Sequence, residues 1–432
     1  MKLLLLYRRR WWLFYLPVLL CAMTALWWST VEWQLLPPDR LIIAAGSLQG
    51  GYSPLARRYA EKLERIGLKV DIVYSNQQKG SLERLLDASD AASLGFANGL
   101  YARSARQVQS LAVIGQEPVW VFAPIDRPQS LTQAKGLRVA AGKLSSASHL
   151  AAGLLLTHAG LRSGDTTFKT LSGMAAADAL IDGKLDLVIM AGGEDSQAVQ
   201  LLARQGNIQI MGTENAGALA VQEPYLQPLL LPQGSIELRG DVPPRDLTLM
   251  SLQTHLLIKP GMHPALQRAL LDAAVEIHEM PSFLQRHGQF PALRGSDFVM
   301  SPTARAYEMG TRPWLESLLP YRAAQRAALF LYAVLPILCI AVLLLMWIPK
   351  VFDWRINAAL NHFYGDVKFL ESDIEKFATD KPMAMRGLLE QLDGIERQVV
   401  TLDMPDEYSE RWYTLREHLA LARERLLKLR SR

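Results

Sequence analysis

The chain has 432 residues, of which 50% are hydrophobic, and its formal net charge is +4. This length suffices for more than one domain, and the near balance of charge argues against a general nucleic-acid-binding surface. The only cysteines, Cys21 and Cys339, lie in apolar runs, so the sequence predicts no disulfide framework.

Two apolar runs are long enough to cross a membrane. Residues 11–31 carry no charge and follow Arg8, Arg9 and Arg10, and residues 327–348 also carry no charge. Arginines before a first span place residues 1–10 in the cytoplasm, and no A-x-A cleavage site follows that span. We therefore expect an uncleaved anchor in a bacterial inner membrane, with both termini cytoplasmic and the segment between the spans extracytoplasmic.

The segment after the first span reads as a strand, a loop and a helix. Leu41–Ala45 is an apolar run typical of a buried strand, and glycines at 46, 50 and 51 allow a tight turn. Ser53 is a suitable N-cap and Pro54 suits the first helical position. Free N–H groups at such a helix start favour an anion, although a βα turn that only needs flexible residues remains an alternative.

The same pattern recurs, so the sequence predicts an α/β fold with a parallel sheet between helices. Extended runs at 111–123 are expected to be interrupted at 116–118. We predict lobe one at 40–118 and 254–315 and lobe two at 124–248, with crossings at Val119–Ala123 and Leu247–Lys259. Polar loops at the strand ends of the two lobes would then face one another. Ligands bind at this edge in open α/β sheets, and hinge closure of the lobes can trap a ligand there.

Four short motifs carry a resemblance to a known family: Gly46-Ser47-x-x-Gly50-Gly51-Tyr52-x-Pro54, Gly80-Ser81-x-x-x-Leu85-Leu86, Gly136-Leu137-Arg138-Val139 with Ser145-Ser146-Ala147, and Asp182-Gly183-Lys184-Leu185-Asp186. In this order they resemble the TAXI-type solute-binding subunits of TRAP transporters. The segment 241–247 and the second span resemble a membrane-anchored branch of that family. The resemblance implies a two-lobed periplasmic-binding-protein type II fold. Such a protein traps a small solute, often an anionic acid or an amino acid, for a TRAP-type permease.

Polar and glycine residues of the predicted loops are the candidate ligand contacts. They are Ser47, Gly50, Gly51, Tyr52, Gly80, Ser81, Asn98, Ser145, Ser146 and Ala147. Hydroxyls and helix-start N–H groups can hold a carboxylate without arginine, although each serine could equally serve only as a helix cap.

The sequence contains no recognisable catalytic motif, so we do not expect an enzyme. The serines near His149 lack a G-x-S-x-G motif, and the histidines show no metal-binding spacing, so neither a metal nor a cofactor is expected.

Residues 350–432 differ in kind, because apolar positions there recur with helical spacing on both sides of Pro405. This pattern predicts a cytoplasmic helical hairpin or coiled coil, in which Trp412 and Leu415 pack against Ile395 and Leu392. Residues 383–430 could bind a cytoplasmic partner or a second copy. The chain could therefore be a transmembrane sensor, or a scaffold that has lost ligand binding, instead of a transport subunit.

Overall fold

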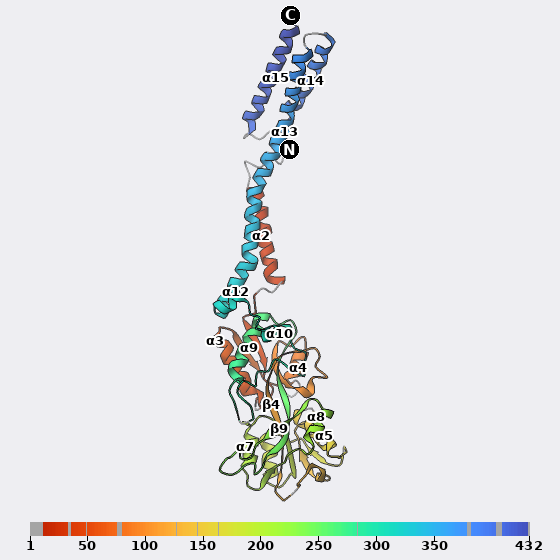
Figure 1. The fold of residues 1–432 in the computed structure, drawn as a ribbon, viewed down its shortest axis with the longest axis vertical. Helices are drawn as coiled ribbons and strands as arrows, with labels where there is room; N and C mark the ends of the chain where they lie inside the picture. The colour runs from red at the N-terminus through yellow and green to blue at the C-terminus, as the bar shows by residue number, and fades with distance from the viewer. Residues whose placement is uncertain are drawn as a thin grey trace. The chain divides into compact units, whose positions relative to one another are not determined.

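The computed structural model describes residues 12–32, 36–48, 50–75, 80–126, 128–144, 146–162, 164–282, 284–377, 382–402 and 408–430 (Figure 1). The chain divides into two units. Leu36–Arg326 forms an α/β unit, and Met1–Leu35 with Ala327–Arg432 forms a helical unit. Each is described by itself.

A ten-stranded sheet forms the centre of the α/β unit. The strands are β1 Arg40–Ala44, β2 Lys69–Val73, β3 Leu94–Asn98, β4 Gln109–Pro124, β5 Arg138–Ala140, β6 Thr167–Lys169, β7 Leu187–Ala191, β8 Ile208–Ile210, β9 Leu226–Leu231 and β10 Leu247–Ile258. Their order is β2-β1-β3-β10-β4-β7-β5-β6, with β8 on β4 and β9 on β10. Strands β1 to β3 are parallel, as are β5 to β7, so the predicted α/β class is confirmed.

The long strands β4 and β10 are antiparallel and run through both halves of the sheet. The expected interruption at 116–118 is wrong, because β4 is one strand of 16 residues. Gln116, Glu117 and Pro118 stay in register with residues 251–253 of β10. The polar residues do not break the strand because their backbone remains paired across the sheet.

The helices cover both faces of this sheet. They are α3 Tyr52–Arg65, α4 Ser81–Leu86, α5 Ala147–His158, α6 Gly173–Ile181, α7 Gln197–Ala203, α8 Ala216–Gln222, α9 Pro264–His278, α10 Pro302–Glu308 and α11 Trp314–Leu318, with the 3-10 turns η1 Gly99–Tyr101 and η2 Leu131–Gln133. In α3, Ala56, Tyr59 and Leu63 recur at helical spacing on the buried face, and Gly67, with φ of +92°, follows its end.

Separate hydrophobic cores lie at the two ends of the sheet. One core joins α3 and α9 to residues such as Phe96 and Leu256, and on the same face another joins α5 and α8 to Val121 and Ile189. We call the part around the first core lobe one and the part around the second lobe two. Figure 1 shows α3 and α9 at one end of β4 and α5 and α8 at the other. The stretch of β4 between these cores is polar.

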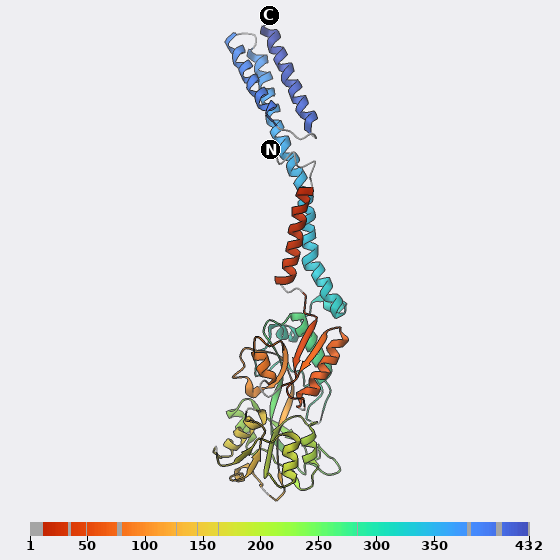
Figure 2. The same cartoon turned by 180° about the vertical axis from the view of Figure 1, so that it is seen from behind.

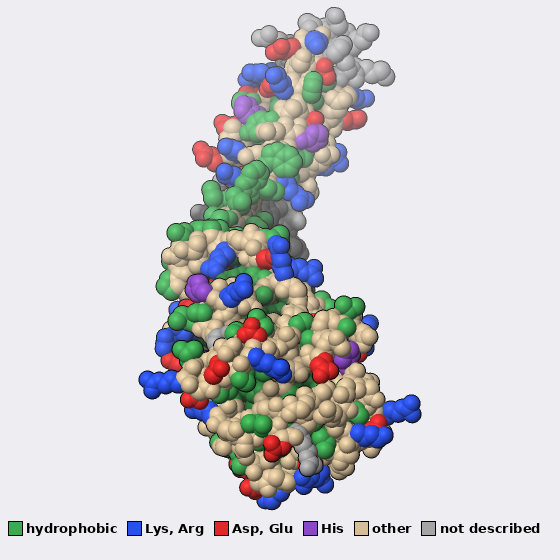
Figure 3. Space-filling model, turned by 60° about the horizontal axis from the view of Figure 1, so that its bottom comes forward, with side chains coloured by type: hydrophobic (Ala, Val, Ile, Leu, Met, Phe, Trp, Pro, Cys, Tyr) green, Lys and Arg blue, Asp and Glu red, His purple; other side chains and the backbone are tan. Residues whose placement is uncertain are grey.

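The surface of the α/β unit carries both signs of charge. On the face in Figure 3, basic and acidic side chains of the described residues are interspersed, and neither sign forms a large patch. This distribution agrees with the near-balanced net charge of +4.

Within the described part of the chain, one helix is long and apolar enough to cross a membrane, by length and composition only, and most of it lies in the helical unit. It is continuous over Tyr321–Lys376 and includes α12 Tyr321–Leu329, a π-helical segment Phe330–Val334 and all but the last residue of α13 Leu335–Phe377. The predicted span 327–348 lies within it. Helix α2, Trp12–Glu32, has a shorter apolar part at Tyr15–Trp28, so the first span stays a prediction. The two views show α2 beside α13 (Figures 1 and 2).

The C-terminal region is a three-helix bundle and not a hairpin. Helices α14 Pro382–Val400 and α15 Ser409–Arg430 share a core with the second half of α13. The predicted hairpin omitted this third helix. Leu392 and Leu415 are fully buried in the core, whereas Trp412 lies at its edge and donates its indole N–H to the Val399 carbonyl at 3.0 Å. The connecting residues 403–407 lie outside the described part of the chain.

Candidate functional site

The parallel strands of the two lobes end opposite one another. Strand β3 ends at Asn98, which pairs with Thr254 of β10, and β7 ends at Ala191, which is level with Val119 of β4. The Gly192 N–H then bonds to the Pro118 carbonyl at 3.2 Å. The C-terminal edges of both lobes therefore border residues 115–118 of β4. In open α/β sheets, this edge is where ligands bind.

Four side chains from four elements meet at this place. The Thr254 hydroxyl of β10 donates to Oε1 of Glu117 in β4 at 2.8 Å. Tyr52, the first residue of α3, and Asn98, the last residue of β3, also lie beside the Glu117 carboxylate, and both lower its pKa as hydrogen-bond donors. We call these four residues the inter-lobe cluster.

Burial dominates the electrostatics of the cluster. It raises the pKa of the Glu117 carboxyl, even though hydrogen bonds from Tyr52, Thr254 and Asn98 and the nearby His255 act in the opposite direction. Burial, and then the charge of Glu117, raise the pKa of Tyr52 well above its usual value. Among the residues that the structure describes, no lysine or arginine forms an ion pair with Glu117. The carboxylate is therefore held by neutral donors.

One atom of the Asn98 side chain is a buried hydrogen-bond acceptor that no described residue satisfies. Its side chain is only 2% exposed, yet Oδ1 has no hydrogen-bond partner among the described residues. Its amide group, in contrast, serves Tyr52 and Glu117. An unpaired buried acceptor is unfavourable, so this oxygen is suited to accept a hydrogen bond from a bound molecule.

On lobe two, the strand end is bordered by the start of α5. Ser146 is the N-cap of this helix: its hydroxyl donates to the Lys143 carbonyl at 2.8 Å and accepts from the His149 N–H at 3.3 Å. The Ser148 hydroxyl accepts from the Ala191 N–H at 3.0 Å, which ties α5 to the end of β7. The hydroxyl of Ser146 is thus engaged in capping, as the alternative interpretation held.

The structure brings two of the predicted contacts, Tyr52 and Asn98, into one cluster. Ser47, Gly50 and Gly51 lie in the loop that precedes α3, where the Gly50 N–H bonds to the Ser47 carbonyl at 2.9 Å. The N-cap of α3 is Gly51, so the expectation that Ser53 caps this helix is wrong. Ser53 faces the core instead and is buried.

Ser81 has a structural partner. Its buried hydroxyl donates to the Ala44 carbonyl of β1 at 2.7 Å and accepts from the Phe96 N–H of β3 at 3.4 Å. Gly80, and not Ser81, is the N-cap of α4, and its N–H bonds to the Glu83 carboxylate at 2.7 Å. The Ser81 hydroxyl therefore joins the ends of β1 and β3. A bulky substitution at Ser81 would disturb the fold, because it would displace this hydroxyl from β1 and β3.

The remaining predicted contacts lie at the lobe-two edge or outside the description. Ala147 is the first residue of α5 and packs against the lobe-two core. Ser145 lies outside the described residues. The structure places Ser146 and Ala147 at the end of lobe two that borders β4.

Sequence reasoning missed Glu117 and Thr254. The available signal was an acidic residue flanked by polar residues in an otherwise apolar strand, which we interpreted as an interruption. Thr254, more than a hundred positions away, reaches Glu117 only because β4 and β10 pair. A local pattern could not have linked the two.

A serine, a histidine and an aspartate form a chain on β10 and the segment after α9. His255 Nε2 lies 3.0 Å from Asp297 Oδ2, and His255 Nδ1 lies 3.2 Å from Ser296 Oγ. His255 is fully buried, and Ser296 Oγ also accepts from the Phe298 N–H at 3.2 Å. A catalytic base must reach a substrate, so this chain is better explained as an anchor for residues 296–298.

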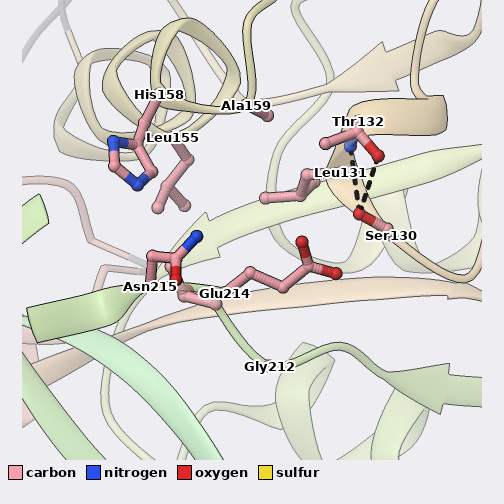
Figure 4. Close-up of a pocket in the computed structure, with 10 residues that line it drawn as sticks. Ser130, Leu131, Thr132, Leu155, His158, Ala159, Gly212, Glu214 and Asn215 are labelled. Atoms are coloured by element: carbon pink, nitrogen blue, oxygen red, sulfur yellow. Dashed lines mark hydrogen bonds between the residues drawn. The ribbon is translucent and has the colours of Figure 1, made fainter. Parts of the chain in front are cut away.

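A small pocket lies elsewhere in lobe two (Figure 4). It has a volume of about 90 Å³ and is lined by residues that include Ser130, Thr132, His158, Glu214 and Asn215. Its walls include the C-terminal end of α5, whereas the inter-lobe edge borders the N-terminal end of that helix. Sites for drug-sized ligands typically measure roughly 300–1,000 Å³, so this pocket suits at most a very small molecule.

Comparison with known protein families gives one match. Residues 43–244 match the NMT1-like family. The match covers lobe two and the N-terminal part of lobe one, which is slightly less than half of the chain. No curated protein sequence matches the chain.

Solved structures with similar folds were also found. The aliphatic sulphonate binding protein SsuA from Escherichia coli is 14% identical, with 71% of this chain and 83% of that chain covered and a TM-score of 0.38. A putative sulfonate-binding SsuA from Methylobacillus flagellatus KT is 17% identical, with 68% and 86% covered and a TM-score of 0.37. A TctC solute binding protein from Polaromonas is 16% identical, with 57% and 86% covered and a TM-score of 0.35. Likenesses this distant carry no argument about function.

Proposed function

We propose that the α/β unit is a solute-binding domain that takes up a small molecule between its two lobes and is not an enzyme. The observation that carries this proposal is the inter-lobe cluster, where four polar side chains meet at the lobe-one strand end that faces the strand ends of lobe two. The match to the NMT1-like family, which covers lobe two and the N-terminal part of lobe one, supports it. Tyr52 and Asn98 would contact the solute directly, together with Glu117.

The surrounding loops would complete the site. Ser47, Gly50 and Gly51 would contribute from the loop before α3, Ser145 and Ser146 from the segment before α5, and Ala147 from the first turn of α5. Gly80 and Ser81 would act by holding the ends of β1 and β3 in place, since the Ser81 hydroxyl joins them. Closure of the lobes would occur about β4 and β10, which show a register shift between Thr254 and His255.

We further propose that the protein is anchored in the inner membrane by residues 11–31 and 327–348 and delivers its solute to a TRAP-type permease. The long apolar helix Tyr321–Lys376 supports the second span. The four motifs that resemble TAXI-type subunits support the choice of permease. In this arrangement the α/β unit is periplasmic and the three-helix bundle is cytoplasmic.

A thermal-shift screen of the full-length protein in detergent, against organic acids, amino acids and amines, tests the binding function. A solute at 100 times its dissociation constant stabilises the native state by about 2.7 kcal/mol. For a domain of this size, that corresponds to roughly 5 °C in Tm. Asn98→Leu should abolish the shift, whereas Thr132→Ala, in the small lobe-two pocket, should preserve it. The reverse result would move the site to that pocket.

The three-helix bundle favours a second candidate function, that of a transmembrane sensor. Twelve buried apolar residues from three helices form its core, and delivery of a solute outside the cell requires no such domain. Cells that carry a chain truncated after Arg355, just before the first core residue Ile356, distinguish the two functions. Uptake lost at normal membrane levels and normal solute binding would assign the bundle to transport, whereas full uptake would favour signalling.

A further inference from the structure

The hydrogen-bond donors of the inter-lobe cluster are used within the cluster. Thr254 donates its hydroxyl to Glu117 at 2.8 Å, and the neighbouring Tyr52 hydroxyl and Asn98 amide lower the pKa of this carboxyl as donors. What the cluster retains is acceptor capacity. It consists of the Asn98 Oδ1 atom, which has no partner among the described residues, and the remaining lone pairs of the Glu117 carboxylate.

The charge of the cluster also favours a ligand that donates hydrogen bonds. Glu117 is partly buried, and none of the described lysines or arginines pairs with it. Its carboxyl pKa is raised by burial, and burial together with the charge of Glu117 raises the pKa of Tyr101 to about 12. A buried carboxylate is favourable only when a cation or several donors compensate it, and Glu117 has neutral donors but no lysine or arginine partner among the described residues. A bound cation would therefore supply the countercharge that the fold leaves out.

We propose that the solute taken up between the lobes carries a protonated amine, whose N–H groups bind the Glu117 carboxylate and Asn98 Oδ1. An ammonium group has three donors and no acceptor, and it is therefore complementary to two convergent acceptors. An anionic group at the same position would meet the Glu117 carboxylate. This inference rests on the proposed binding function and specifies the class of solute, an amine or an amino acid.

Matched pairs of probes test the inference by calorimetry on the full-length protein in detergent. The pairs are leucine with 4-methylpentanoate, glutamate with glutarate, and putrescine with butane-1,4-diol. The ammonium-bearing member of at least one pair should bind, and its partner should not bind at the same concentration. Binding near the raised pKa of Glu117 should also release protons, which appears as a dependence of the binding enthalpy on the ionisation enthalpy of the buffer.

Variants separate the role of the charge from that of the fold. Glu117→Gln keeps the shape but removes the charge, and it should weaken binding of the ammonium-bearing probe by roughly 30-fold or more. Thr254→Val removes only a donor to Glu117 and should have a smaller effect. Thr132→Ala, in the small pocket, serves as the matched control and should bind as the unmodified protein does.

The outcomes distinguish this inference from the proposed function. Equal binding of an acid and its amino partner, or tighter binding of an acid by Glu117→Gln, would overturn the ammonium assignment and leave solute binding intact. Failure of every probe, together with an empty thermal-shift screen, would overturn both.

Discussion

The Glu117→Gln substitution should stabilise the solute-free protein, and more so at pH 8 than at pH 5. Burial raises the pKa of this carboxyl in the folded state, although three hydrogen bonds act to lower it. The native state therefore holds the proton more tightly than the unfolded chain, in which the pKa is roughly 4.3. The corresponding stability is present at low pH and is lost as the pH rises through the folded-state pKa.

The size of the effect follows from the pKa difference. Each unit by which the native pKa exceeds the unfolded value corresponds to about 1.4 kcal/mol lost at high pH. A domain of this size gains roughly 2 °C in Tm per kcal/mol. The advantage of the variant should be smallest near pH 5 and should reach its plateau once the pH exceeds the native pKa.

Thermal unfolding of the full-length protein in detergent, followed by differential scanning fluorimetry at pH 5 and pH 8, measures this difference. Glu316→Gln is the matched control. Glu316 pairs with Arg268 through two contacts of 2.6 Å, so the substitution should destabilise by roughly 2 kcal/mol or more. A Glu117→Gln variant that becomes less stable than the unmodified protein as the pH rises would refute the reasoning. The hydrogen bonds to Glu117 would then outweigh its burial.

Three further predictions concern topology, the bundle and the strand ends. Reporters fused after Arg432 and inserted near Gly183 should report opposite sides of the membrane, and the same side for both would exclude the two-span arrangement. Leu415→Ala should destabilise the bundle by about 2–5 kcal/mol, measured by chemical denaturation, because this side chain is fully buried; a loss below 1 kcal/mol would contradict the three-helix core. Ser81→Ala should lower stability by roughly 1–3 kcal/mol, since it leaves the Ala44 carbonyl without its 2.7 Å donor, and an unchanged Tm would show that this bond is dispensable.

Local patterns in the sequence predicted the elements around the site. The apolar run at 41–45, the glycine-rich loop and the helical spacing of Leu55, Tyr59 and Leu63 together predict β1 and α3, since each signal lies within a few residues. The first helical residue, Tyr52, and the strand end, Asn98, were both candidates, and both lie in the cluster. The helix caps were displaced by one or two residues, because glycines took the cap positions expected for serines.

Contacts between distant residues could not be predicted in the same way. The carboxylate at the centre of the site depends on pairing between β4 and β10, and Ser81 reaches a carbonyl 37 positions away. The third helix of the bundle was overlooked because its apolar positions, among them Ile356, Leu360 and Val367, continue directly from the apolar span. The expectation of an anionic solute came from helix N-termini and from the family resemblance, and neither of these reveals the acceptors that pairing of β4 with β10 brings together.

Hydrogen–deuterium exchange of the full-length protein, with and without a solute from the thermal-shift screen, tests the central claim most directly. A solute held between the lobes should slow exchange in peptides from both lobes, namely 46–54, 94–101, 114–120, 141–149 and 250–256. The same peptides should exchange at their solute-free rates in Asn98→Leu. Protection confined to peptides around 130–132, 155–159 and 212–215 would place the solute in the small pocket of lobe two and would contradict binding between the lobes.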